Sequence, residues 1–206
     1  MGGSGSDGAD TQPSKSWLSD PGVIVVELTG RRARGDKGRK VKGNAMGGTG
    51  WSYVTAWRGD VAATFAALQK EVFESRAFYP LNENPGAQEV YATIEELWQD
   101  EYIWESETHS ILDIDTVLDP DEHPVWPTKG TGFPERTVYF RTLRPLPLSV
   151  VSEVFGTEHP TREDYERLCR EEDLTYRFHI RHTGVCVTLW SDGVPAEVAF
   201  WGSSGL

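Results

Sequence analysis

The sequence predicts an α+β fold, with a mostly antiparallel sheet and amphipathic helices packed on one face of it. Two observations favour this class. Sequential hairpin-like pairs of strands dominate the chain while long crossovers between strands are few, and the Asp192-Gly193 pair between two apolar runs is a typical hairpin turn. The predicted order of elements is β-α-α-β-β-α-α-β-β-β.

Residues 1–45 are predicted to be a flexible or dispensable extension, and residues 46–206 a single α+β domain. The first ten residues are rich in Gly, Ser and Asp, a composition that buries too little apolar surface to order itself. One strand-like run, Val23–Leu28, stands alone in the extension. The basic run Arg31–Lys42 is interrupted by glycine, and is consistent with a nucleic-acid arm or with a solvated tail.

The domain opens with a strand followed by a helix. Trp51–Trp57 alternates and is rich in β-forming residues. Asp60 is a typical N-cap for a helix over Val61–Glu74, whose apolar residues recur at helical spacing on one side. This helix is therefore expected to pack on the sheet.

A long loop at Arg76–Val90 separates this helix from an acidic one. Thr93 and Glu96 form a capping-box pattern at the start of a helix predicted over Ile94–Trp104. Glu95 and Glu96 lie in its first turn, where acidic side chains suit the positive end of the helix dipole. The later acids, Asp100 and Glu101, form either a solvated face or a docking face for a basic partner.

The stretch Thr108–Leu118 is predicted to be a central strand and the best place to look for a site. Because residues two apart in a strand share a face, His109, Asp113 and Asp115 would point the same way. Cα atoms two residues apart in a strand are separated by roughly 6.5–7 Å, so the carboxylates of Asp113 and Asp115 could share a cation or a proton. The alternative is a partly solvated face of which the acids are simply the polar residues.

Four elements are predicted after this stretch. Asp119–Glu135 contains four prolines and is expected to be a loop, and Arg136–Leu143 a strand. A short helix starts at Ser149 and ends at Gly156, a favourable residue after a helix terminus. Thr161 is expected to cap a further helix that extends to about Glu172.

Three strands close the chain. Tyr176–His182 is interpreted as a strand or the approach to one, and Val185–Trp190 is a strand of continuous apolar character. After the Asp192-Gly193 turn, Ala196–Trp201 returns antiparallel.

The charge is distributed unevenly. Residues 1–50 hold eight basic and five acidic residues, a net charge of +3, whereas the whole chain carries −12, so residues 51–206 carry −15. Such an acidic body is repelled by phosphate backbones and anionic membranes, so nucleic acid is an unlikely partner except through Arg31–Lys42. A basic protein is the natural partner, and acidity that only keeps the protein soluble is the alternative. The candidate partner-binding residues are Glu95, Glu96, Trp98, Asp100, Glu101 and Trp104.

The first functional hypothesis is an acidic cytoplasmic protein-binding module, for example one of the immunity or antitoxin kind, that neutralises a basic partner. The alternative is a small metal-dependent or acid/base enzyme that uses Asp113 and Asp115 with a histidine, either His109 or His123. The third is a nucleic-acid-associated protein that binds through its basic tail. No motif for a cofactor is present, and none is expected. Cys169 and Cys186 lack metal-type spacing, and no apolar run is long enough to span a bilayer.

Several segments together resemble a family of small, uncharacterised actinobacterial proteins of about 150 residues, seen mostly in Streptomyces. The resemblance covers Trp51 to Gly205. It is carried by Tyr53-Val54-Thr55, the helix from Asp60 to Phe73, Thr108 to Ile114, and Phe200 to Gly205. The resemblance implies one intact domain and a bacterial cytoplasmic setting, and it implies no activity, cofactor or catalytic residue.

Overall fold

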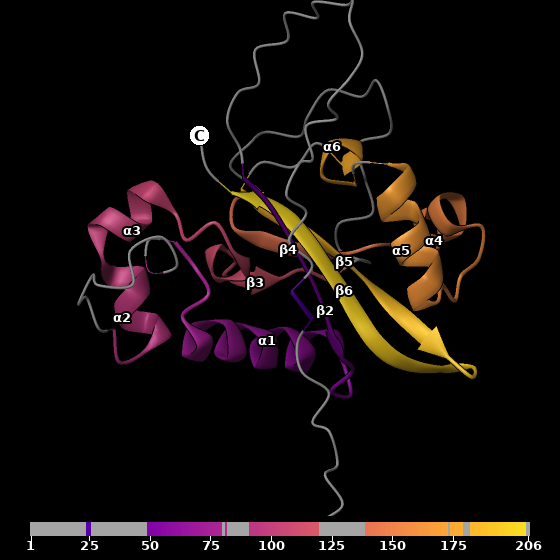
Figure 1. Ribbon diagram of the computed structural model, residues 1–206, viewed down its shortest axis with the longest axis horizontal. Coiled ribbons are helices and arrows are strands. Elements are labelled where there is room, and N and C mark those ends of the chain that lie inside the picture. Colours follow the sequence, from indigo (N-terminus) through magenta and orange to yellow (C-terminus); the bar gives the residue numbers. More distant parts are fainter. Residues whose placement is uncertain are drawn as a thin grey trace, which may run out of the picture.

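The computed structural model describes residues 24–25, 49–79, 81, 91–119, 139–172, 174–178 and 182–204. Six strands form one sheet in the order β1-β2-β6-β5-β4-β3 (Figure 1). β1, β2, β6 and β5 are antiparallel neighbours, whereas β4 runs parallel to both β5 and β3. The α+β class is confirmed, and the sheet is mixed rather than antiparallel throughout. The strands are β1 Ile24–Val25, β2 Thr49–Ala56, β3 Thr116–Val117, β4 Thr142–Pro145, β5 Thr183–Ser191 and β6 Val194–Ser204.

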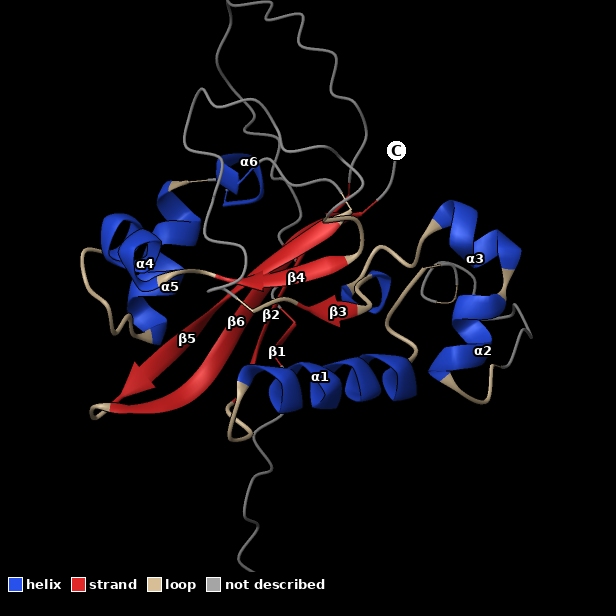
Figure 2. Ribbon diagram, turned by 180° about the vertical axis from the view of Figure 1, so that it is seen from behind, coloured by secondary structure: helices blue, strands red, loops and turns tan. Residues whose placement is uncertain are grey.

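Helices cover both faces of the sheet, so the prediction that they pack on one face is wrong. α1, α2 and α3 lie on one side and α4, α5 and α6 on the other (Figure 1 and Figure 2). The helices are α1 Val61–Ser75, α2 Ile94–Gln99, α3 Glu101–Ser106, α4 Leu148–Phe155, α5 Arg162–Glu171, α6 Leu174–Phe178 and the 3-10 helix η1 Ile111–Asp113. The physical reason is visible in β6, where Phe200 belongs to one apolar core and the adjacent Trp201 to the other. A strand that is apolar at successive positions is buried on both faces.

α1 forms as predicted. Ala63 N donates a 2.6 Å hydrogen bond to Asp60 Oδ1, which is the expected N-cap. Phe65, Leu68 and Val72 lie on the buried side of this helix, against the sheet. The helix ends at Ser75 and is followed by the C-cap residue Arg76, whose φ of 55° is left-handed.

The predicted hairpin at Asp192-Gly193 is confirmed. Both residues have positive φ, 52° and 79°, which favours glycine at the second position. The hairpin joins β5 to β6, and the register between them shifts at Leu189/Trp190, opposite Pro195. A proline close to such an irregularity is tolerated because a ladder hydrogen bond is already interrupted there.

Residues 108–118 do not form the predicted central strand. They form η1 at Ile111–Asp113, followed by the two-residue strand β3. Ser110 Oγ accepts a hydrogen bond from Leu112 N, and the Asp113 carboxylate accepts one from Ser110 N, so a capping box closes the turn. Residues 110 to 114 are all buried, so the alternation does not separate a buried face from an exposed one.

Two further predictions are wrong in their details. The helix expected over Ile94–Trp104 is two helices, because Asp100 leaves the helical conformation with a ψ of 120° and caps α3 through Tyr102 N at 2.8 Å. The strand expected over Tyr176–His182 is replaced by α6 at its start, while residues 179–181 lie outside the described part of the chain.

The remaining helices and β4 are close to their predicted places. α4 ends at Gly156 with a φ of 75°, and Thr161 caps α5 in a capping box with Asp164. Of the strand predicted over Arg136–Leu143, only Thr142 and Leu143 are confirmed, because residues 139–141 form a turn in which Arg141 has a φ of 57°. Residues 120–138 lie outside the described part. α4, α5 and α6 form the connection between the parallel strands β4 and β5, which needs a long crossover.

Part of the predicted extension contributes to the sheet. β1, which lies within the lone strand-like run Val23–Leu28, pairs with β2 through Ile24 opposite Val54 and Val25 opposite Tyr53. The basic run Arg31–Lys42 lies outside the described residues, and the dispensability of residues 1–45 stays a prediction. Of the helices that the structure describes, none has the length and apolar character needed to cross a membrane.

Candidate functional site

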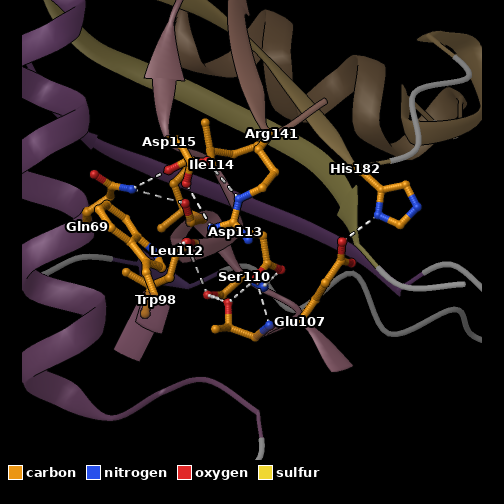
Figure 3. A network of polar contacts seen from close by, with 12 residues as sticks. Gln69, Trp98, Glu107, Ser110, Leu112, Asp113, Ile114, Asp115, Arg141 and His182 are labelled. Atoms are coloured by element: carbon orange, nitrogen blue, oxygen red, sulfur yellow. Dashed lines mark hydrogen bonds and ion pairs between the residues drawn. The ribbon is translucent and has the colours of Figure 1, made fainter. Parts of the chain in front are cut away.

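The three residues expected on one strand face have separate surroundings, because residues 108–118 turn instead of running straight. Asp113 lies inside η1, Asp115 precedes β3, and His109 lies before the turn with a φ of 52°. Figure 3 shows Asp113 and Asp115 in different parts of one polar network. The structure therefore does not bring them together as a shared ligand pair.

Asp113 is a buried carboxylate that holds the turn. Thr108 donates to Asp113 Oδ1 from its backbone N at 2.6 Å and from Oγ1 at 2.7 Å, and Ser110 N donates to Oδ2 at 3.2 Å. Burial raises the pKa of Asp113, and hydrogen bonds from Ser204 and Thr108 oppose the rise. Tyr53 contributes to the same interior, and burial raises its pKa to about 12.

Asp115 is the partner of a buried cation. Arg141 Nε donates to Asp115 Oδ2 at 2.9 Å and Arg141 Nη2 to Oδ1 at 2.8 Å, which is a bidentate pair. The Arg141 side chain is only 6% exposed, so it needs this counter-charge. The ring of Trp104 covers the guanidinium, with 4.9 Å between the Arg141 Cζ atom and the ring centroid.

His109 takes part in an aromatic contact rather than in a carboxylate site. Its ring stacks on Tyr79 with 5.0 Å between the centroids. The Tyr79 hydroxyl lies 3.0 Å from the hydroxyl of Tyr102 on α3. His109 therefore packs on Tyr79, which follows α1.

No metal centre is formed within the part of the chain that the structure describes. In those residues, no three His, Cys, Asp or Glu side chains are gathered closely enough to hold an ion. Asp113 and Asp115 have the partners given above, and Cys186 is fully buried and free. The other metal candidate, His123, lies outside the described residues.

The six candidate partner-binding residues divide into two groups. Trp98 is half-buried and donates from Nε1 to Leu112 O at 2.8 Å, while Glu96 accepts from Ala92 N at 2.7 Å. Asp100 accepts a hydrogen bond from the Tyr91 hydroxyl, which lowers its pKa, and caps α3. These three residues stabilise the helices. Glu95, Glu101 and Trp104 are exposed, and the ring of Trp104 covers the guanidinium of Arg141.

α3 presents an acidic face that is bordered by aromatic rings. Residues 91–107 hold six acidic residues and no basic residue. Trp104 is 54% exposed and Tyr102 is 52% exposed. At about 3.6 residues per turn, the exposed Glu101 and Glu105 lie between these two rings around the helix. We call Glu101, Tyr102, Trp104 and Glu105 the acidic-aromatic face.

A pair of residues that the sequence did not indicate, Glu107 and His182, lies beside this face. His182 Nδ1 is in contact with Glu107 Oε1, and the Glu107 side chain is only 6% exposed (Figure 3). Glu107 follows α3 and His182 precedes β5, 75 positions later. No spacing rule joins residues so far apart, so sequence reasoning had no signal for this pair.

The backbone is strained at this pair. Glu107 has φ 58° and ψ 164°, a region that is essentially restricted to glycine, and His182 has φ 56°. Arg141, with φ 57°, is joined to them through Arg141 N, which donates to His182 O at 2.7 Å. Each such residue costs on the order of 1–3 kcal/mol and persists only where its surroundings fix it. Strain of this kind gathers at functional sites.

A row of rings connects the pair to the acidic-aromatic face. Phe140, which is 44% exposed, lies 5.3 Å from the ring of His182 and 6.3 Å from the ring of Trp104, measured between centroids. The rings of Trp104, Phe140 and His182 therefore follow one another in a row, which runs from the exposed face to the His182 side chain, itself 14% exposed.

The comparisons with known proteins give no further guide to this surface. The chain matches no protein-family model, no curated protein and no solved structure. The function proposed below rests on the geometry and charge of the described residues.

Proposed function

We propose that this protein is an acidic binding module that docks a basic protein partner on its acidic-aromatic face. The observation that carries the proposal is the exposure of Tyr102 and Trp104 on a helix whose other exposed residues are Glu101 and Glu105. Large rings of this kind are costly to leave in water, and they are enriched at the centres of protein interfaces.

The charge of the face defines the chemistry of the partner. Glu101 and Glu105 give the face its negative charge and residues 91–107 include no basic residue, so the face attracts Lys and Arg side chains and repels anionic surfaces. Guanidinium and ammonium groups also bind favourably over aromatic rings such as that of Trp104. Association is expected to be fast at low salt and weaker at high salt.

We propose that the protein acts in a bacterial cytoplasm, in the manner of an immunity or antitoxin protein. Neutralising a basic protein requires only a complementary surface and no chemistry. The resemblance of residues 51–205 to small actinobacterial proteins supports that setting.

The experiment is affinity capture of a partner from bacterial lysate, with charge-reversed variants as the test. The wild-type protein is expected to retain a basic protein at low salt and to release it when salt is raised. Glu101→Lys combined with Glu105→Lys is expected to abolish retention of that protein, and Trp104→Ala to reduce it at least about tenfold.

The matched control reverses the same number of charges elsewhere. Glu153 on α4 and Glu163 on α5 are exposed, and Glu153→Lys with Glu163→Lys changes the net charge equally. The proposal requires that this control retains the partner. Equal loss in both double variants would show that net charge, rather than the acidic-aromatic face, governs capture.

A further inference from the structure

The contact between Glu107 and His182 has the geometry of an acid–base pair. Glu107 Oε1 meets Nδ1 of the ring, so a neutral His182 donates its Nδ1–H to the carboxylate and keeps the lone pair on Nε2. In Figure 3 the ring extends away from the polar network, with Nε2 on the side opposite Glu107. A buried carboxylate that orients a histidine in this way fixes the tautomer that a general base needs.

The backbone keeps this pair in place. Glu107 N donates to Ile103 O at 2.8 Å, His182 N to Ser203 O at 2.8 Å, and Arg141 N to His182 O at 2.7 Å. These bonds hold three residues with positive φ, and none of the three is glycine. A general base has to be positioned within a few tenths of an ångström before its substrate arrives, and such restraint provides that.

We infer that His182 is the general base of a hydrolytic site, with Glu107 as its positioning residue, and that the site takes neutral carboxylic esters with an aromatic or apolar group. This activity goes beyond partner binding and does not depend on it.

The surroundings of His182 define the class of substrate. The half-exposed ring of Phe140, 5.3 Å away, offers an apolar surface to one part of the ligand. Glu107 is acidic, and Arg141 has its guanidinium paired in bidentate fashion with Asp115. The negative charge of Glu107 behind the ring is not offset by Arg141, so the field at Nε2 disfavours an anionic substrate, whereas a neutral ester meets no such penalty.

The reaction is a hydrolysis in which water is the second reactant. His182 Nε2 accepts a proton from a water molecule while the water oxygen forms a bond to the ester carbonyl carbon. When the tetrahedral intermediate collapses, the bond from that carbon to the alcohol oxygen breaks, and the proton on Nε2 passes to this oxygen. The products are a carboxylic acid and an alcohol, and His182 returns to its neutral form.

The test uses the full-length protein, p-nitrophenyl acetate as the probe, and a variant that suits the backbone. His182→Gly removes the imidazole at a position whose φ of 56° glycine adopts freely, so the fold is expected to persist. The hydrolysis rate above buffer is expected to fall at least about tenfold, since a general base contributes on the order of 10²–10⁴. Added imidazole is expected to restore part of the rate to His182→Gly and to add little beyond its own solution reaction to the wild-type protein.

The matched control is His159→Ala, because exposed histidines in general hydrolyse activated esters slowly. His159 is exposed and its ring contacts that of Trp190, near the other end of β5 from His182. This variant is expected to keep the wild-type rate within about twofold. A wild-type rate no higher than that of His182→Gly, or a loss in His159→Ala equal to that in His182→Gly, would overturn the inference.

A spectroscopic measurement tests the role of Glu107 independently of activity. Nitrogen-15 NMR of the histidine rings is expected to show His182 with its proton on Nδ1. In Glu107→Gln this tautomer preference is expected to be lost, and the hydrolysis rate is expected to fall at least about tenfold. A wild-type ring protonated on Nε2 alone would contradict the assignment of His182 as the base.

Discussion

The carboxylate of Glu107 contacts Nδ1 of His182 although the two residues are 75 positions apart, and both residues have left-handed φ values of 58° and 56°. One side-chain contact thus joins the end of α3 to the start of β5. Glu and His residues rarely adopt a positive φ, so the contact and the hydrogen bonds around it have to offset the backbone strain at both residues.

The strain at Glu107 gives a first prediction, in which glycine stabilises the protein relative to alanine. Glu107→Gly and Glu107→Ala both remove the carboxylate, but only glycine adopts φ 58° and ψ 164° without penalty. The glycine variant is expected to be more stable by about 1–3 kcal/mol, the reverse of the usual order. Chemical denaturation of the two variants measures the difference, and a more stable alanine variant would show that the backbone at residue 107 is not left-handed.

A second prediction concerns the contact of Trp51 with the sheet. Trp51 on β2 donates from Nε1 to Ser204 Oγ at 2.9 Å, and its ring covers Gly202. A Cβ at Gly202 would lie 2.3 Å from Trp51 Cζ2 and 2.5 Å from Thr183 O. Gly202→Ala is therefore expected to destabilise the fold by about 3 kcal/mol, at the upper end of the range for overpacking, because one of the two neighbours is backbone.

The control for this prediction separates crowding from conformation. Gly156 has a φ of 75°, but a Cβ there would meet nothing within 4 Å. Gly156→Ala is expected to cost only about 1 kcal/mol, from backbone strain alone. Thermal or denaturant unfolding of both variants checks the order, and equal losses would contradict the close approach of Trp51.

The buried carboxylate of Asp113 gives a prediction about pH. Burial raises its pKa above the ordinary value of 3.8, so the folded protein binds this proton more tightly than the unfolded chain does. The contribution of Asp113 to stability is therefore fully present below 3.8 and is lost as pH rises through the higher folded value. The free energy of unfolding of the wild-type protein, relative to that of Asp113→Asn, is therefore expected to be larger at about pH 4 than at about pH 7.

This comparison isolates one group, because every other titrating residue is common to the two proteins. Denaturant titrations at both pH values give the two differences. A larger advantage of the wild-type protein at pH 7 would mean that the hydrogen bonds from Thr108 and Ser110 outweigh burial and lower the pKa of Asp113.

Local signals in the sequence predicted local structure well. Asp60 caps α1, Thr161 caps α5, and Asp192-Gly193 turns the closing hairpin, because each depends only on residues within a few positions. The same kind of signal misled at residues 108–118. Their alternation favoured a strand, but Ser110 and Asp113 carry a capping box whose short-range hydrogen bonds close a 3-10 turn instead.

The candidate site was predicted only in part, since its contacts are not local. Trp104 and Glu101 were identified from the acidic helix, and both are exposed. Glu107 and His182 were missed because only the tertiary structure places the end of α3 beside the start of β5. The proposed pairing of Asp113 with Asp115 failed for the same reason: Arg141, 26 positions away, takes Asp115 as its partner.

Another prediction concerns the chain that lacks residues 1–45. β1 supplies only two residues to the ladder, Ile24 opposite Val54 and Val25 opposite Tyr53, while β6 pairs with β2 over its full length. The truncated protein is therefore expected to fold, with a free energy of unfolding lower by about 1–2 kcal/mol, since each lost hydrogen bond contributes about 1 kcal/mol. Far-UV circular dichroism and denaturation measure this, and an unfolded chain would contradict the domain boundary near Met46.

Truncation is also expected to change self-association. Without β1, the outer edge of β2 presents its N–H and C=O groups to other molecules, and an open edge of this kind is a template for pairing between chains. Sedimentation velocity is expected to show dimers or larger species for the truncated protein at concentrations where the full-length protein is monodisperse. Full-length protein with Ile24→Pro and Val25→Pro is the matched variant, because it keeps every other residue and cannot donate backbone hydrogen bonds from β1. If this variant associates as the truncated chain does, the cause is the loss of β1 pairing; if it behaves as the wild-type protein does, β1 does not protect the edge of β2.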